Sequence, residues 1–219
     1  MNQQTNVLSK IVFIVSLIIM ALTACRKDEI ISDGKSAYTP VNSDRAPGNS
    51  AKAHIAASEK LEIPASVSVP ENFPNGNTRV ATYYAVGVQK YKAQTKAGSL
   101  PVTYEWVFVA PRAELYDVTN SKVGTHGAGP YWEISSFDSI FAQQFSPART
   151  ATSPDPESID WLLLKPKTGT TPTGIFADVD YIQRIATKGG KAPETPPTSP
   201  TETTEVKYKA VYRFTKINQ

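Results

Sequence analysis

The chain of 219 residues has little of what marks disulfide-bonded or metal-binding proteins. It contains one cysteine and two histidines, which excludes an internal disulfide, a multi-cysteine zinc site and a histidine-rich metal centre. Its 23 basic and 20 acidic residues give a net charge of +3, which is too balanced to predict nucleic-acid binding. Beyond the N-terminal region, no stretch shows a long, capped helical pattern.

A targeting pattern occupies the first 25 residues. Lys10 is the only charged residue before position 26, and Ile11 to Leu22 is almost wholly apolar. That run is shorter than the roughly 20 apolar residues that span a bilayer, and a basic start followed by such a run is typical of a secretory signal. It ends in Leu22-Thr23-Ala24-Cys25, which resembles the lipobox of bacterial lipoproteins. We therefore expect residues 1–24 to be a lipoprotein signal peptide and Cys25 to be lipidated. The alternative is an ordinary secretory signal with an incidental cysteine.

The resemblance to a lipobox implies a membrane partner. Two or three acyl chains on Cys25 would each contribute about 0.8 kcal/mol per buried methylene, and more than one chain gives durable anchoring. Arg26 follows the cysteine, where an aspartate would suggest inner-membrane retention in some bacteria. Lys27-Asp28-Glu29 resembles the surface-export signal of Bacteroidota lipoproteins, although it also fits the solvated start of a tether. The sequence predicts an outer-membrane lipoprotein and leaves open which face of the membrane carries the domain.

The mature sequence divides into a tether and one domain. Residues 25–60 are rich in Ser, Asp, Asn, Pro, Gly, Lys and Ala, a composition that cannot bury enough apolar surface to offset its chain entropy. A short helix is expected within Ala51 to Leu61. Residues 61–219 are expected to form a β domain.

The domain shows the period-two alternation of β-strands. Strands are predicted over residues 79–93, 102–109, 140–145, 159–164, 179–186 and 206–214. The clearest is the last, where alternate residues from Val206 to Phe214 are apolar and Val211 is the exception. Residues 159–164 are expected to be buried on both faces. Pro101 and Pro111 are expected to bracket the second strand.

Short strands separated by turn residues predict an all-β fold, an antiparallel β-sandwich or a barrel-like single domain with short or no helices. Two segments rich in Pro, Thr and Ser, residues 146–158 and 192–204, are expected to be mobile surface loops.

Five segments in this order resemble the domain of unknown function 3455 family of secreted bacterial and fungal proteins, over roughly residues 61–216. They are Gly87–Tyr91, Trp106–Pro111, Gly124–Glu133, Trp161–Leu164 and Ile182–Gly190. The resemblance brings no established activity, although some fungal members carry a malate dehydrogenase label. The family pattern usually has two cysteines where this chain has Ala93 and, approximately, Pro197, which implies the loss of one disulfide.

Nicotinamide dinucleotide binding and other cofactors are not expected. Gly124, Gly127 and Gly129 are spaced as G-x-x-G-x-G, which is not the G-x-G-x-x-G that opens a dinucleotide-binding helix. The segment from His126 to Gly129 also resembles the oxyanion loop of esterases. That reading needs a G-x-S-x-G elbow, and the sequence has none.

The segment Gly124–Glu133 is the best candidate site. Its glycines would let His126, Trp132 and Glu133 gather, with Gln89 and Arg184 as further ligand-binding candidates, and Trp132 would stack on a sugar or another flat ligand. In the alternative, His126 and Arg184 form buried hydrogen bonds and Trp132 fills the core.

Carboxylates suggest a weaker candidate site. Asp178 and Asp180 share one face of a predicted strand and form a weak calcium candidate. No metal site is otherwise expected.

The function expected from the sequence is a membrane-anchored, non-enzymatic binding or interaction module for a small-molecule, glycan or protein ligand. The alternative is an extracellular hydrolase that acts on a glycan or an ester through His126 and Glu133. The sequence favours a protein that is not an enzyme.

Overall fold

A computed structural model of the protein describes residues 55–219. The predicted signal peptide, Cys25 and the predicted tether up to residue 54 lie outside the described residues. Within the part described, no helix combines the length and apolar character needed to cross a bilayer.

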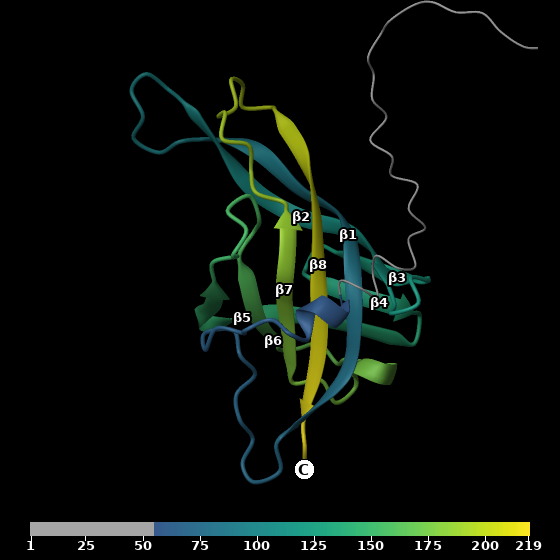
Figure 1. Ribbon diagram of the computed structural model, residues 1–219. Coiled ribbons are helices and arrows are strands. Elements are labelled where there is room, and N and C mark those ends of the chain that lie inside the picture. The colour runs from purple at the N-terminus through teal and green to yellow at the C-terminus, as the bar shows by residue number, and fades with distance from the viewer. Residues whose placement is uncertain (1–54) are drawn as a thin grey trace, which may run out of the picture. The chain divides into compact units, whose positions relative to one another are not determined.

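Residues 55–219 form an antiparallel β-barrel in which each strand pairs with its neighbour in sequence (Figure 1). β8 closes the barrel by pairing with β1, from Asn77 opposite Ile217 to Lys92 opposite Thr203. The all-β prediction is therefore confirmed, in its barrel form. The elements are β1 (Asn77–Thr95), β2 (Tyr104–Tyr116), β3 (Lys122–Gly127), β4 (Tyr131–Ser135), β5 (Asp138–Ala151), β6 (Trp161–Pro166), the short helix η1 (Gly174–Phe176), β7 (Tyr181–Gly189) and β8 (Thr203–Ile217).

Aromatic side chains fill one part of the barrel interior. Phe176 of η1 packs on Phe214 of β8 with ring centroids 4.8 Å apart, and Trp132 of β4 meets Phe214 at 5.6 Å. The predicted apolar face of the last strand is confirmed, because Tyr208, Ala210, Tyr212 and Phe214 all belong to this core. Alternate residues of a strand point to opposite faces, so the neighbouring lysines lie outside.

A second apolar cluster covers the outer face of β6, β7 and β8. The segment preceding β1 packs Leu61, Ile63, Val67 and Val69 against a buried set made of Trp161, Leu163, Ile185 and Val211. This layer explains why Val211 breaks the alternation of β8. The prediction of burial on both faces is confirmed for residues 161–164, since Leu164 faces the interior core, and it was wrong for Asp160, which is exposed and precedes β6.

Two predicted strand ends were wrong. β2 continues through Pro111 to Tyr116, and β5 runs to Ala151, so the first half of the predicted loop 146–158 is strand. Prolines are tolerated in strands that lack a partner on one side, and both strands have such a stretch. The first half of β2 also projects past the barrel in the long β1–β2 hairpin of Figure 1, which leaves Phe108 49% exposed.

β3 and β4 were not predicted as strands, because glycines interrupt their pattern. Gly124 lies so close to β4 that a Cβ atom there would stand 2.2 Å from the carbonyl oxygen of Glu133. Gly129 has φ +126° in the connection between the two strands. The glycines that suggested a turning loop therefore also permit a tight strand pair.

The Pro-rich segment between β7 and β8 is attached to the β1–β2 hairpin. Trp106 Nε1 donates to the Thr195 carbonyl at 2.9 Å, and the Ala93 amide donates to the Glu202 carbonyl at 2.8 Å. Ala93 and Pro197 are both buried. Packing and these hydrogen bonds thus hold a region where the family resemblance implies a disulfide.

Candidate functional site

An opening in the barrel wall defines the candidate site. β3 pairs with β2 only from Ala113 to Tyr116, and the pairing of β4 with β5 runs only from Asp138 to Phe141 on β5. Within residues 55–219, the stretch Tyr104–Arg112 of β2 and most of β5 beyond Ala142 have no strand partner on the sides facing β3 and β4. The short β3–β4 hairpin therefore closes only part of the wall between them.

A cavity of about 290 Å³ lies at this opening. Its rim is formed by the unpaired part of β2, the β3–β4 connection and Gln144 of β5. Its floor is formed by His126, Trp132, Leu162, Leu164, Arg184 and Tyr212. A second cavity of about 370 Å³ shares Phe108, Gln144, Leu162 and Arg184 with the first and adds Gln89 and Tyr91. The two cavities are neighbours that share these lining residues, and together we call them the side cavity.

His126 lies in the floor of the side cavity, 3% exposed, with both ring nitrogens engaged. Nδ1 is 2.7 Å from the Tyr131 carbonyl oxygen and Nε2 is 3.0 Å from the Tyr212 hydroxyl. A carbonyl only accepts, so Nδ1 carries the proton, and the neutral ring accepts from Tyr212 at Nε2. Burial lowers the pKa of His126 to about 3. The ring also stacks on Trp132, with centroids 4.5 Å apart.

Arg184 of β7 is the cation of the side cavity. It is half-buried, and its Nε and Nη2 donate to the Asp160 backbone carbonyl at 3.2 and 2.7 Å. No carboxylate within residues 55–219 forms an ion pair with it; the salt bridges there join other residues. A backbone carbonyl therefore holds the guanidinium in place without neutralising it.

Two buried N–H groups of side chains that line the side cavity lack a hydrogen-bond partner. Gln89 is 2% exposed and Trp132 is fully buried, and neither Gln89 Nε2 nor Trp132 Nε1 has an acceptor among the described residues. A buried donor left unsatisfied costs about 1–3 kcal/mol. Such groups are consistent with a ligand or ordered water that would satisfy them.

Glu133 lies on the other side of the wall from His126. His126 is opposite Trp132 in the β3–β4 pair and stacks on it, whereas Glu133 is opposite Thr125 and exposed. Because side chains alternate along a strand, Glu133 points out of the barrel. The structure thus gathers Gln89, His126, Trp132 and Arg184 around the side cavity and leaves Glu133 outside it.

The two aspartates suggested for calcium take separate partners. Asp180 Oδ2 accepts from the Ile217 amide at 2.7 Å, while Asp178 is exposed and lies 3.9 Å from Lys216 Nζ. Within residues 55–219, no three His, Cys, Asp or Glu side chains gather as a metal site would require.

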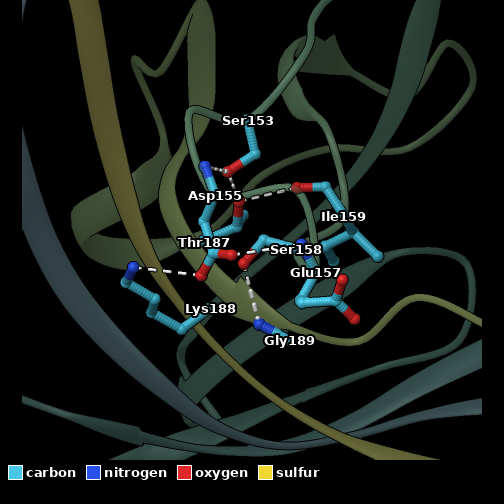
Figure 2. A network of polar contacts seen from close by, with 8 residues as sticks. All are labelled: Ser153, Asp155, Glu157, Ser158, Ile159, Thr187, Lys188 and Gly189. Atoms are coloured by element: carbon cyan, nitrogen blue, oxygen red, sulfur yellow. Dashed lines mark hydrogen bonds and ion pairs between the residues drawn. The ribbon is translucent and has the colours of Figure 1, made fainter.

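A polar network holds the loop that carries Asp160 (Figure 2). Thr187 of β7 donates to the Ile159 carbonyl at 2.6 Å, Ser158 Oγ accepts from the Gly189 amide at 2.9 Å, and Lys188 pairs with Asp155 at 3.0 Å. The loop from β5 to β6 is thereby fixed to the end of β7. The Asp160 carbonyl that receives Arg184 is positioned by these contacts.

Sequence reasoning missed several residues of the side cavity. Tyr212 was expected only as a core residue, and nothing in the sequence singled out Gln144. Phe108 to Pro111 belong to a segment that carried the family resemblance, which was the one available signal. Pairing lengths, which decide where the wall opens, are not visible in a single sequence.

One comparison with known proteins gives a match. The model of a family described as a protein of unknown function, DUF3455, matches residues 74–216. No curated protein and no solved structure matches the chain.

Proposed function

We propose that the chain, which belongs to the DUF3455 family of proteins of unknown function, is a small-molecule-binding module. Because the family brings no activity with it, this role is derived from the side cavity. The observation that carries the proposal is a fixed cation, Arg184, that lines both cavities, together with one unpaired buried donor in each: Trp132 in the cavity of about 290 Å³ and Gln89 in that of about 370 Å³. Ligand sites are typically concave, mostly apolar and provided with a few fixed polar groups.

The hydrogen bonds and the pKa of His126 favour a binding function over a catalytic one. Its two nitrogens are occupied by Tyr131 and Tyr212, and its lowered pKa keeps the ring neutral near pH 7. A general base needs a free lone pair within reach of the proton that it takes. The expected partner Glu133 faces away. These features support a scaffold role for His126, and no hydrolase is proposed.

Blocking the cavity rim tests the proposal. In a thermal-shift screen of metabolites and glycan fragments, ligands should raise the melting temperature of the full-length chain. The variant Gln144→Trp, at an exposed rim position, should abolish the shifts. Ala148→Trp places the same bulk at an exposed position of β5 that does not line the side cavity, and should preserve them. Equal shifts in both variants would refute binding in the side cavity.

We also propose that acyl chains on Cys25 anchor the module in the outer membrane, facing the cell surface. The support is the sequence Leu22-Thr23-Ala24-Cys25 followed by Lys27-Asp28-Glu29. Cys25→Ala should abolish labelling with a radioactive or clickable fatty acid and release the protein from membranes, because no acyl chain remains to partition into the bilayer. Membrane association that survives the substitution would rule out the anchor. Protease treatment of intact cells should remove the wild-type domain if it faces outward.

A further inference from the structure

We infer that the side cavity binds a small organic carboxylate with an apolar body. This inference rests on the proposed binding function and adds the chemical class of the ligand. It follows from three properties of the lining residues: the buried side-chain groups left without a partner are donors, the cation is not neutralised, and much of the remaining wall is hydrocarbon.

The buried polar groups without a partner would be satisfied by hydrogen-bond acceptors on a ligand. Gln89 Nε2 and Trp132 Nε1 are both N–H donors without partners, and the guanidinium of Arg184 carries only donors. Tyr212 gives its proton to His126. A ligand that only accepts hydrogen bonds matches this set, and an ionised carboxylate has two acceptor oxygens and no donor.

The charges around the side cavity favour an anion. No acidic residue lines the first cavity, and in the second Asp160 contacts Arg184 through its backbone carbonyl. Lys191 lines the second cavity as well. The positive charge also acts on His126 in the floor of the side cavity. Burial is the main cause of its lowered pKa, and the charge of Arg184 lowers that pKa further. A half-buried cation without a counter-ion is a natural position for a ligand's negative charge.

The shape and walls limit the rest of the ligand. Phe108, Leu162, Leu164 and Tyr212 present hydrocarbon around the guanidinium. Each of the two cavities, of about 290 and 370 Å³, lies near the lower end of the range for ligand pockets, so a ligand that fills either one is small. The guanidinium of Arg184 presents a planar fork of donors, which matches the two oxygens of a carboxylate.

Matched pairs of carboxylates and amides provide the test. Phenylacetate and hexanoate, each with its primary amide, are titrated into the full-length chain by calorimetry, with tryptophan fluorescence as a second readout. Inorganic phosphate is titrated in parallel. We expect each carboxylate to bind at least tenfold more tightly than its amide. Arg184→Gln should remove that preference and Arg184→Lys should restore part of it. The control Arg112→Gln changes an arginine that is paired with Glu205 and lines neither part of the side cavity, and should preserve it.

The outcomes separate this inference from the binding function itself. Equal affinity for acid and amide would overturn the inference while leaving a functional cavity. A carboxylate preference that persists in a folded Arg184→Gln variant would also overturn it, as would phosphate binding that displaces the carboxylates. If no acid of the panel binds although other ligands give cavity-dependent thermal shifts, the inference fails and the proposed function stands. If the wider screen also gives no such shifts, both fail.

Discussion

A neutral, fully engaged histidine is the residue on which the floor of the side cavity depends. His126 receives the Tyr212 proton, donates to the Tyr131 backbone and lies flat against Trp132. One ring thus links β3, β4 and β8 across the barrel interior. Since burial lowers its pKa to about 3, protonating it in the folded state would leave a buried charge opposite a hydroxyl that donates to it.

The His126 environment predicts a loss of stability in mild acid. An unfolded histidine has a pKa of about 6.5, and the folded value is lower, so below pH 6.5 only the unfolded chain takes up the proton. The stabilisation is complete above about pH 6.5 and is lost as the pH falls toward 3, at up to about 1.4 kcal/mol per pH unit. Urea unfolding between pH 7.5 and 4.5 should show this slope, and His126→Gln should reduce it.

Carboxylates contribute to the pH dependence of both proteins, so the difference between the two curves isolates the histidine. Parallel curves for wild type and His126→Gln would contradict the assignment. If the variant does not fold, nitrogen chemical shifts of the wild-type ring provide the check. They should show the Nδ1–H tautomer unchanged at pH 4.5, whereas titration near 6 would contradict the lowered pKa.

At the scale of elements, the segment before β1 acts as an outer layer of the barrel. Val67 is fully buried against β6, β7 and β8, and its carbonyl accepts from Gln183 Nε2 at 2.8 Å. Contacts begin still earlier: Ile55 packs on Tyr84, and Glu59 pairs with the buried Arg213 at 3.3 Å. This layer covers apolar residues that would otherwise face water.

A charge placed in this layer should be costly. Val67→Asp buries a carboxylate among apolar side chains and is expected to destabilise the domain by several kcal/mol. Val118→Asp makes the same change at a residue that is 48% exposed, and should stay within about 0.5 kcal/mol of wild type. Urea denaturation measures both. A small effect at Val67 would show that the segment is not packed on the strands in solution.

For the whole molecule, the decisive feature is how far neighbouring strands pair. β1 and β8 pair over nearly their full lengths, while β3 and β4 are short and leave parts of β2 and β5 without a partner. Every strand of the barrel pairs with a neighbour on each side, yet these short pairings leave an opening in the wall between β2 and β5. The side cavity follows from this difference in strand lengths.

Hydrogen exchange should reveal the open side. Amides of Ala113 to Tyr116 lie between two strands and should exchange slowly. In Trp106 to Ala110, paired on the β1 side alone, about every second amide points to the unpaired side and should exchange fast. Residue-resolved exchange by NMR measures this contrast. Uniform protection along β2 would indicate that the wall is closed in solution.

The sequence allowed the regular strands to be predicted and left the site geometry largely open. Alternation from Val206 to Phe214 predicted β8, because one face lines the interior. The same rule failed at Gly124, where a missing side chain reflects a close backbone approach. Gln89, His126, Trp132 and Arg184 were selected as polar or aromatic residues in distinctive segments, but which face each occupies depends on register. Register is set by pairing with distant strands, which a single sequence does not display.

Each strand edge beside the opening carries a proline. Pro111 lies in the part of β2 that has only β1 as a neighbour, and Pro147 lies in the part of β5 that has no partner on β4. Exposed strand edges recruit strands from other copies, and a proline interrupts the row of donors that such recruitment requires. The two prolines therefore make pairing with a strand of another copy less favourable at the very edges that the opening exposes.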